Sequence, residues 1–412
     1  MTARKRLAHE LKRALFRRAT LDAWLDDLLA PGRALGATPL GRAFLRLLPE
    51  RTVRVAPFGD RAAADRGSVV LLTLVPPEDT GGGSRPAQLA AELHRRGFTI
   101  DWRYALPIFP WPSLRRPSVS GLAVTFLDGR GIPPPDEPTL VLVEAPHPRF
   151  LDVLARLRPG TPVLYDAIDV WDGTLGAGWY DARAESAILE RATALAASSA
   201  LLRDELAHRT GRDVALVENG VDPRVFDPTV PRCAPADMRR GAPTVVYVGA
   251  LWGDWVDLDL VATVARALPE ASFNLIGAAG ARRLPAADNV VALGPRPQRD
   301  VPAYLAAADV AIVPFVTSRL SAAVSPLKAF EYLAMRRPVV STPLPELHGV
   351  PGVTIADGAT AFAAAIVDAA RRPFPRASAA GFVAGHTWQA RVDRLLDIAT
   401  RDIGVPPNER TD

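Results

Sequence analysis

The feature that most constrains the fold is a regular alternation of short apolar runs with helical segments, which occurs twice along the chain. The first run, residues 69–75, contains Thr73 as its only polar residue, and a glycine-rich loop and a helical pattern over residues 86–96 follow it. Strands that are buried on both faces read as continuous apolar runs. The alternation therefore predicts parallel sheets with helices on both faces.

The runs form two series, separated by a Pro- and Arg-rich segment that is typical of a linker, residues 223–242. The first series has strand-like runs at residues 69–75, 98–100, 139–143, 162–165 and 214–217, with helices over 86–96 and 184–194. The second has runs at residues 244–249, 272–277, 290–294, 310–314 and 338–341, with helices over 258–268 and 301–308. The sequence predicts two doubly wound α/β domains, 67–235 and 236–384, and a ligand at the strand carboxyl ends that face the cleft between them.

Both ends of the chain have a helical pattern. Leu7, Leu11 and Leu15 recur at helical spacing among Arg and Lys residues in a basic extension, residues 1–66, which lacks the apolar segment of a secretory signal. Such a helix either lies on an anionic membrane surface or packs with its basic face in solvent. A terminal helix within residues 385–412 is expected to pack on either of the two domains, and the N-terminal domain is one candidate.

Charge and composition exclude several classes of protein. The net charge is +4 and the arginines are scattered among acids, which is not the basic stripe of a nucleic-acid binder. No apolar run reaches the ~18 residues of a membrane span. Cys233 is the single cysteine, so an internal disulfide and a cysteine metal cluster are excluded. Lys328 is the only lysine beyond residue 12, in a chain that otherwise uses arginine.

The segment 325–331, Ser-Pro-Leu-Lys-Ala-Phe-Glu, has the pattern of an anion site. Pro326 near a helix start leaves backbone N–H groups directed outward, where the helix dipole favours an anion. Lys328 would add a positive charge for a diphosphate, and Glu331, one turn on, could accept hydrogen bonds from ribose hydroxyls. The alternative is a surface Lys–Glu pair worth a few tenths of a kcal/mol.

The chain resembles the GT-B glycosyltransferases, specifically the nucleotide-sugar-dependent group that includes family 4, and most strongly so over residues 245–347. The resemblance spans roughly residues 68–400 and rests on the order of several short motifs, namely the Gly-rich loop 81–83, Asn-Gly-Val-Asp at 219–222, Tyr-Val-Gly-Ala at 247–250, Asn-Leu-Ile-Gly at 274–277, Leu-Gly-Pro at 293–295 and Pro-Leu-Lys-Ala-Phe-Glu-Tyr at 326–332. Two features depart from the family pattern. Ala323 stands where the first glutamate of a Glu-x7-Glu pair is usual, and the turn at Gly249 lacks the usual Arg/Lys pair, so Lys328 or Arg319 would supply that charge.

The resemblance implies two Rossmann-like domains that face a cleft and a nucleotide diphosphate sugar as the donor substrate, with no cofactor and no metal. The donor-binding residues that it implies are Gly83, Gly249, Gly277, Pro295, Ser325, Pro326, Leu327, Lys328 and Glu331. Gly280 lies in the same loop as Gly277. The pair Asp257 and Asp259 resembles a metal-binding Asp-x-Asp but opens a helix, where acids are expected.

Candidate catalytic residues follow strands of the first domain. Asp166 and Asp169 come after the run 162–165, where either could deprotonate an acceptor hydroxyl or could serve a turn or helix cap. His147, after the run 139–143, is a further candidate for a general base or an acceptor contact. An apolar and aromatic loop, residues 106–112, suits a lipid-linked acceptor, a membrane interface or burial against the other domain.

The sequence therefore predicts a metal-independent hexosyltransferase that moves a sugar from a nucleotide diphosphate sugar to a glycan or lipid-linked acceptor. Its expected role is synthesis of a cell-surface polysaccharide or glycoconjugate, and its expected place is the cytoplasm, with possible peripheral contact to the membrane. Two alternatives remain open: a GT-B-type sugar-nucleotide epimerase, and a non-catalytic scaffold that binds nucleotide sugars or a partner, which the missing first glutamate keeps open.

Overall fold

The structure is a computed structural model, and it describes residues 65–77, 82–106, 122–127, 137–251, 255–279, 284–285 and 287–400. The predicted helices of the basic extension, most of the apolar loop 106–112, and Gly280 lie outside these residues.

The N-terminal domain is built on a seven-stranded parallel sheet with the strand order β3-β2-β1-β4-β5-β6-β7. Its strands are β1 (Ser68–Thr73), β2 (Thr99–Tyr104), β3 (Leu122–Phe126), β4 (Leu140–Val143), β5 (Val163–Ala167), β6 (Ala194–Ala197) and β7 (Ala215–Leu216). Its helices are α4 (Arg85–Arg95), α5 (Phe150–Leu154), α6 (Ala182–Arg191) and α7 (Ala200–Thr210), with a short 3-10 turn, η3 (Thr174–Gly176). The central strands β1 and β4 are almost fully buried, as their continuous apolar runs predict.

The C-terminal domain has a six-stranded parallel sheet with the order β10-β9-β8-β11-β12-β13. Its strands are β8 (Thr244–Val248), β9 (Ser272–Ile276), β10 (Val290–Gly294), β11 (Val310–Val313), β12 (Val339–Ser341) and β13 (Val353–Ile355). Its helices are α8 (Leu258–Ala267), α9 (Val301–Ala307), α10 (Arg319–Ala322), α11 (Leu327–Ala334), α12 (Gly358–Arg371) and α13 (Arg376–Gly385), with 3-10 turns η4 (Gln298–Asp300) and η5 (Pro345–Leu347).

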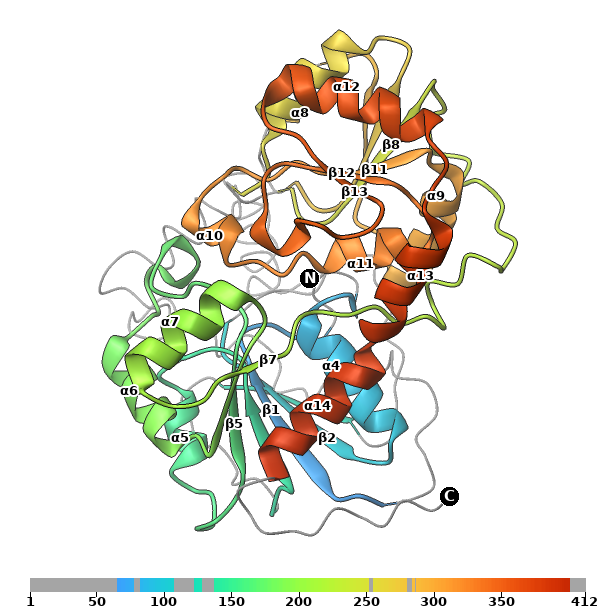
Figure 1. Ribbon diagram of the computed structural model, residues 1–412. Helices are drawn as coiled ribbons and strands as arrows, with labels where there is room; N and C mark the ends of the chain where they lie inside the picture. The colour runs from blue at the N-terminus through green and yellow to red at the C-terminus, as the bar shows by residue number, and fades with distance from the viewer. Residues whose placement is uncertain are drawn as a thin grey trace, which may run out of the picture.

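The predicted fold class is confirmed: two doubly wound α/β domains lie one above the other, with helices on both sides of each sheet (Figure 1). The strand order reverses between β1 and β4 in one sheet and between β8 and β11 in the other. Such switch points are where open α/β sheets bind ligands, at the strand carboxyl ends.

One local prediction needs correction and one is supported. The helix expected over residues 184–194 ends at Arg191, and Ala194 already belongs to strand β6. The alanine-rich sequence of β6 reads as helical by propensity, but burial between neighbouring strands decides its conformation. The expectation that Asp257 opens a helix and does not bind a metal is supported, because its side chain accepts a hydrogen bond from the N–H of Leu260 at 2.7 Å and caps α8.

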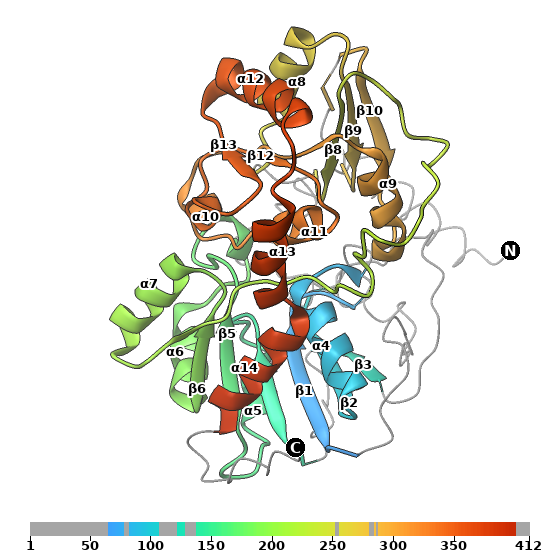
Figure 2. The same cartoon turned by 45° about the vertical axis from the view of Figure 1, so that its right-hand side comes forward.

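The last two helices connect the two domains. α13 lies against α11 of the C-terminal domain, and α14 (Trp388–Thr400) lies against α4 of the N-terminal domain (Figure 2). Trp388, Val392 and Leu395 of α14 are part of the N-terminal core, at no more than 3% exposed. Arg96 at the end of α4 pairs with Asp393 of α14 at 2.5 Å. Among the described residues, no helix has the length and apolar character that crossing a membrane requires.

Replacing Trp388 by alanine should destabilise the protein strongly, because it removes a fully buried ring from the contact between α14 and the N-terminal core. We expect the free energy of unfolding, measured by urea denaturation followed by circular dichroism, to fall by about 3–5 kcal/mol. Arg394→Ala on the exposed face of the same helix is the control and should change it by less than about 0.5 kcal/mol. Equal losses in the two variants would contradict this account of how α14 is held.

Candidate donor site between the two domains

Helix α11 is held at the carboxyl end of strand β8 by a buried tyrosine. The hydroxyl of Tyr332 accepts a hydrogen bond from the N–H of Val248 at 2.7 Å and lies 3.3 Å from the carbonyl of the same residue. Tyr332 is fully buried, so the helix cannot shift along the strand without losing both contacts. This places the first turn of α11, and Lys328 within it, beside the turn at Gly249.

The Lys328 side chain is partly buried among aromatic rings and backbone. Its ammonium nitrogen is 4.5 Å from the centre of the Phe315 ring and 5.4 Å from that of Tyr247, distances at which cation–π attraction operates. Burial lowers the pKa of the Lys328 ammonium to about 8, against the attraction of the Glu331 carboxylate. Within the described part of the chain its ammonium makes no hydrogen bond or ion pair of its own, so its charge is available to a ligand.

The two predicted glycine turns meet at the same point. Gly249 has φ of +148°, and a Cβ added there would lie 2.8 Å from Cε of Lys328. A Cβ on Gly277, with φ of +152°, would lie 1.8 Å from the carbonyl oxygen of Gly249. Both positions therefore require glycine, because a side chain would push the two turns and the lysine apart. The structure thus brings Gly249, Gly277 and Lys328 together, as expected of one site.

Glu331 is buried on the same helix, one turn after Lys328, at 5% exposed. Burial raises the pKa of its carboxyl group to about 7, although a hydrogen bond from Gln298 and the charge of Lys328 both favour ionisation. Gln298 donates to Glu331 Oε1 at 2.9 Å. Gln298 is not among the residues predicted from the sequence, where the only signal for it is its place directly after the Pro295-Arg296-Pro297 turn.

Gln298 also connects the two domains. The side chain of Gln88 in α4 donates to Gln298 Oε1 at 2.6 Å and to the carbonyl of Gly82 at 2.8 Å. The Gly-rich loop that contains Gly83 is therefore linked to Glu331 through two glutamine side chains. Pro295 lies at the carboxyl-terminal edge of the same sheet as Gly277, because the carbonyl of the preceding Gly294 accepts a hydrogen bond from the N–H of Gly277 at 3.0 Å.

The start of α11 is fixed from the domain junction. The N–H of Asn219 donates to Oγ of Ser325 at 3.1 Å, and its side chain donates to the Ser325 carbonyl at 2.7 Å. Pro326 follows as the N-cap position, and Leu327 packs against the core of the N-terminal domain. Arg319 spans the domains as well, but it pairs with Asp172 at 2.9 Å and Glu205 at 2.8 Å.

Asp166, a predicted catalytic candidate, has a bidentate ion pair with Arg85 at 2.8 and 3.0 Å and is fully buried. The same arginine donates to the carbonyl of Glu218 at 3.0 Å and to Oδ1 of Asn219 at 3.2 Å. Glu144 is buried nearby, and burial together with the Asp166 charge raises the pKa of its carboxyl group well above the usual value. The arrangement connects strand β5 to the junction that positions Ser325.

Asp169 and His147 differ from Asp166 in having fewer polar contacts. Asp169 Oδ1 is buried without a hydrogen-bond partner, and burial raises the pKa of the carboxyl group to about 7. His147 stacks on Trp179 at 5.5 Å and lies 5.7 Å from Phe150 between ring centres. Burial, with the nearby Arg149 charge, lowers the pKa of His147 to about 3, so its imidazole is neutral at physiological pH.

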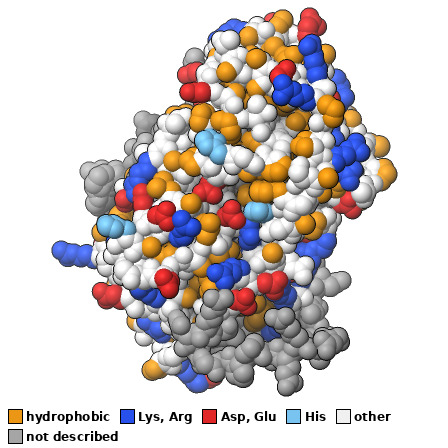
Figure 3. Space-filling view, viewed as in Figure 1, with side chains coloured by type: hydrophobic (Ala, Val, Ile, Leu, Met, Phe, Trp, Pro, Cys, Tyr) orange, Lys and Arg blue, Asp and Glu red, His pale blue; other side chains and the backbone are white. Residues whose placement is uncertain are grey.

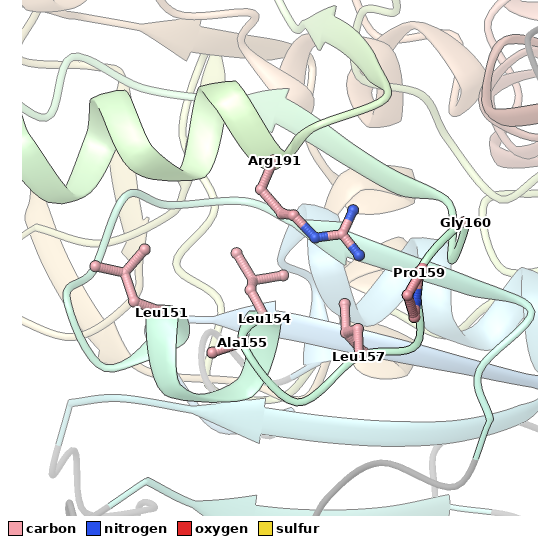
Figure 4. Close-up of a pocket in the computed structure, with 7 residues that line it drawn as sticks. All are labelled: Leu151, Leu154, Ala155, Leu157, Pro159, Gly160 and Arg191. Atoms are coloured by element: carbon pink, nitrogen blue, oxygen red, sulfur yellow. The ribbon is translucent and has the colours of Figure 1, made fainter.

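The N-terminal domain also has an apolar pocket of about 520 Å³, separate from the polar site described above (Figure 4). It lies between the end of α5 and the loop that precedes β5, at the amino-terminal edge of the sheet, and Arg191 is its one charged residue. The candidate donor site lies instead at the carboxyl ends of the strands.

Among the described residues, no group of three or more His, Cys, Asp or Glu side chains has an arrangement that could hold a metal ion.

The two doubly wound domains have the organisation of the GT-B fold, and the chain is similar in sequence and structure to known glycosyltransferases. Residues 242–372 match the family Glycosyl transferases group 1. The chain is 30% identical over 217 residues to the putative teichuronic acid biosynthesis glycosyltransferase TuaH of Bacillus subtilis (strain 168). That match covers 47% of this chain and 53% of that protein, so the chain spans about half the length of this curated relative.

Solved structures share the fold over most of the chain. Sucrose-phosphate synthase of Thermosynechococcus elongatus aligns with a TM-score of 0.59 at 16% identity, over 81% of this chain and 98% of that one. Anabaena HepE, solved in complex with UDP and glucose, aligns with a TM-score of 0.54 at 14% identity, over 80% and 99% of the two chains. The predicted resemblance to the GT-B glycosyltransferases is confirmed.

Replacing Glu331 by glutamine should stabilise the protein at alkaline pH. The folded-state pKa of Glu331, about 7, lies above its ordinary value of 4.5, so folding favours the protonated carboxyl group, and this stabilisation is lost as the pH rises through 7. Glutamine imitates the protonated form. In urea unfolding we expect Glu331→Gln to exceed wild type by about 1–3 kcal/mol at pH 8 and to match it near pH 4.5.

Glu270→Gln, an exposed position in the same domain, is the matched control and should show no such pH-dependent difference. A stability difference for Glu331→Gln that is the same at both pH values would contradict the assignment of a buried, ionising carboxyl group.

Proposed function

We propose that the protein is a glycosyltransferase that transfers a sugar from a nucleotide diphosphate sugar to a glycan or lipid-linked acceptor in polysaccharide synthesis. The observation that carries the proposal is the Lys328 ammonium, held between two aromatic rings and against the Gly249 turn, one helical turn from the buried Glu331. The name of the Bacillus relative, a teichuronic acid biosynthesis glycosyltransferase, supports the polysaccharide role.

In the proposed complex the donor diphosphate lies at the first turn of α11. The backbone N–H groups at the start of the helix and the Lys328 ammonium donate to its oxygens. Negative charge grows on this leaving group as the glycosidic bond to the donor sugar breaks, so preorganised donors lower the barrier. Because Lys328 supplies positive charge directly, we propose that neither a metal nor a cofactor is needed.

Glu331 is proposed to accept hydrogen bonds from the ribose hydroxyls of the nucleotide. Ligand binding would then exchange the hydrogen bond from Gln298 for bonds from ribose. Gly249 and Gly277 leave room for the diphosphate to approach backbone, and Pro295 would lie beside the base. HepE was solved with UDP and glucose, which supports a uridine diphosphate hexose as the first donor to test and a hexosyltransferase as the enzyme type.

The acceptor is proposed to bind over the N-terminal domain, where Asp169 is the candidate general base. Its pKa of about 7 lies close to physiological pH, as efficient proton transfer requires. Its Oδ1 has no hydrogen-bond partner and is closed to solvent, so the proposal requires that acceptor binding opens access to this oxygen. Asp166, held by Arg85, is assigned to positioning, and neutral His147 to a contact with sugar. We further propose that the protein acts in the cytoplasm, at the membrane surface when its acceptor is lipid-linked.

The first test measures binding of UDP, GDP and ADP by calorimetry, followed by donor turnover with and without glycan acceptors. We expect wild type to bind one of these nucleotides, and Lys328→Met to weaken that binding at least tenfold. Glu331→Gln should weaken binding of the ribonucleotide several-fold but affect its 2′-deoxy analogue less, because one of the proposed hydrogen bonds is already missing there. Glu270→Gln should bind as wild type does.

Turnover separates the alternatives. Acceptor-dependent product supports a transferase, free sugar released at a rate that no acceptor changes indicates an epimerase-like hydrolysis, and no response to any nucleotide indicates a scaffold.

The affinity for the nucleoside diphosphate should fall at alkaline pH. The pKa of Lys328 is lowered to about 8, so above that pH a growing share of the free protein has lost the ammonium charge that the diphosphate contacts. Calorimetry between pH 7 and 10 should show a decline that approaches tenfold per pH unit above 8. The weak binding of Lys328→Met should show no such decline, and a wild-type affinity that stays constant to pH 10 would contradict the role of Lys328.

A further inference from the structure

A second, strongly basic pocket lies in the C-terminal domain, far from the donor site along the sheet. Its volume is about 510 Å³. Asp309 and Pro338, which line it, directly precede strands β11 and β12, so the pocket is at the amino-terminal edge of a sheet whose carboxyl-terminal edge holds Gly249 and Lys328. The pocket therefore belongs to neither the donor nor the acceptor site proposed above.

Arginine side chains from four separate segments converge on this pocket, and Asp309 is the one acidic residue in its lining. The arginines are Arg232, Arg336, Arg337, Arg372 and Arg376. They come from the segment before β8, from the turn between α11 and β12, from the end of α12 and from the start of α13. In Figure 3, Lys and Arg side chains lie along the right-hand edge of the C-terminal domain, where Figure 1 shows the end of α12 and the start of α13.

Ordinary structural roles explain some of these arginines. Arg232 donates to the carbonyls of Asp227 and Val225, and Arg337 donates to that of Ala308 at 2.7 Å. Arg372 at the end of α12 pairs with Asp368 at 2.8 Å, and a cation there also suits the helix dipole.

Arg336 and Arg376 have no such structural role among the described residues. Within the described part of the chain, neither guanidinium makes a hydrogen bond or an ion pair, although Asp227 attracts Arg336 at longer range. Arg376 is the first residue of α13, where the helix dipole disfavours a cation. Arg336 has φ of +56°, a conformation that favours glycine or asparagine after a helix and that an arginine occupies at some cost.

The arginines also repel one another. Burial lowers the pKa of Arg337, and the charges of Arg336 and Arg376 lower it further, against the attraction of Asp309. The three guanidinium groups are therefore close enough to interact within one pocket. Bringing them together costs free energy that a bound anion would offset.

We propose that this pocket is a second binding site, which takes a phosphate-bearing ligand. Guanidinium groups bind phosphate oxygens through paired N–H donors, and those of Arg336 and Arg376 have all their donors available. Met335 and Phe374, also in the lining, add apolar side chains that suit the organic part of such a ligand, so a phosphorylated sugar or a lipid headgroup fits better than phosphate alone.

The test uses inorganic pyrophosphate as the probe and hydrogen exchange to locate it. To weaken binding at the donor site equally in all proteins compared, the parent protein, the pocket variant and the control all carry Lys328→Met. In the parent, millimolar pyrophosphate should slow amide exchange in residues 335–338 and 374–378. Adding Arg336→Gln and Arg376→Gln should weaken pyrophosphate binding at least tenfold. The control adds Arg183→Gln and Arg394→Gln, which remove two charges from exposed positions in the N-terminal domain and should bind as the parent does.

A vesicle arm distinguishes the two sources of phosphate. Binding to phosphatidylglycerol vesicles but not to phosphatidylcholine vesicles, lost in the pocket variant and kept in the control, identifies a lipid headgroup. Pyrophosphate protection without such vesicle binding identifies a soluble phosphorylated ligand. The proposal is overturned if pyrophosphate leaves exchange in the pocket unchanged, or if the pocket variant and the control bind it equally. Neither result affects the proposed donor site, which Lys328→Met tests separately.

Discussion

The packing of helix α11 against strand β8 is the contact on which the rest of the site depends. The buried hydroxyl of Tyr332 ties the helix to both polar groups of Val248, and Asn219 holds the Ser325 that precedes the helix. Lys328 and Glu331 are thereby fixed one turn apart at the edge of the sheet. Rotating the helix by a quarter turn would move both side chains away from the glycine turns, so their positions depend on the contacts of Tyr332 and Asn219.

The burial that fixes these two residues also brings their pKa values close together. Desolvation lowers the pKa of Lys328 to about 8 and raises that of Glu331 to about 7, although each charge favours the other. Desolvation is the larger effect in both cases. A solvent-exposed Lys–Glu pair at the same spacing would have ordinary pKa values and would contribute a few tenths of a kcal/mol. A buried pair of this kind costs stability in the free protein, which is typical of residues kept for binding.

Much of the fold could be predicted from the sequence because parallel strands buried on both faces leave short, continuous apolar runs bounded by turn residues. The runs at β1, β4, β8 and β11 are continuous and apolar, and all four proved to be central strands. β6 could not be recognised, since Ala-Leu-Ala-Ala carries a helical propensity that its two neighbouring strands override. The helix α7 was missed as well, because its charged residues are not arranged with a clear apolar face.

The candidate site was predictable only where local sequence determines local geometry. Lys328 and Glu331 stand out by their spacing on one helix, and the glycines stand out at strand ends. Gln298 and Gln88 do not, because each acquires its importance from a partner in another segment, 33 or 210 residues away in the chain. Asp166 and Asp169 illustrate the same limit: they lie three residues apart in the sequence, yet Arg85 binds Asp166 while Oδ1 of Asp169 is buried without a partner. Which of two neighbouring carboxyl groups is paired depends on tertiary structure, so the distinction between a positioning residue and a candidate base follows only from the folded chain.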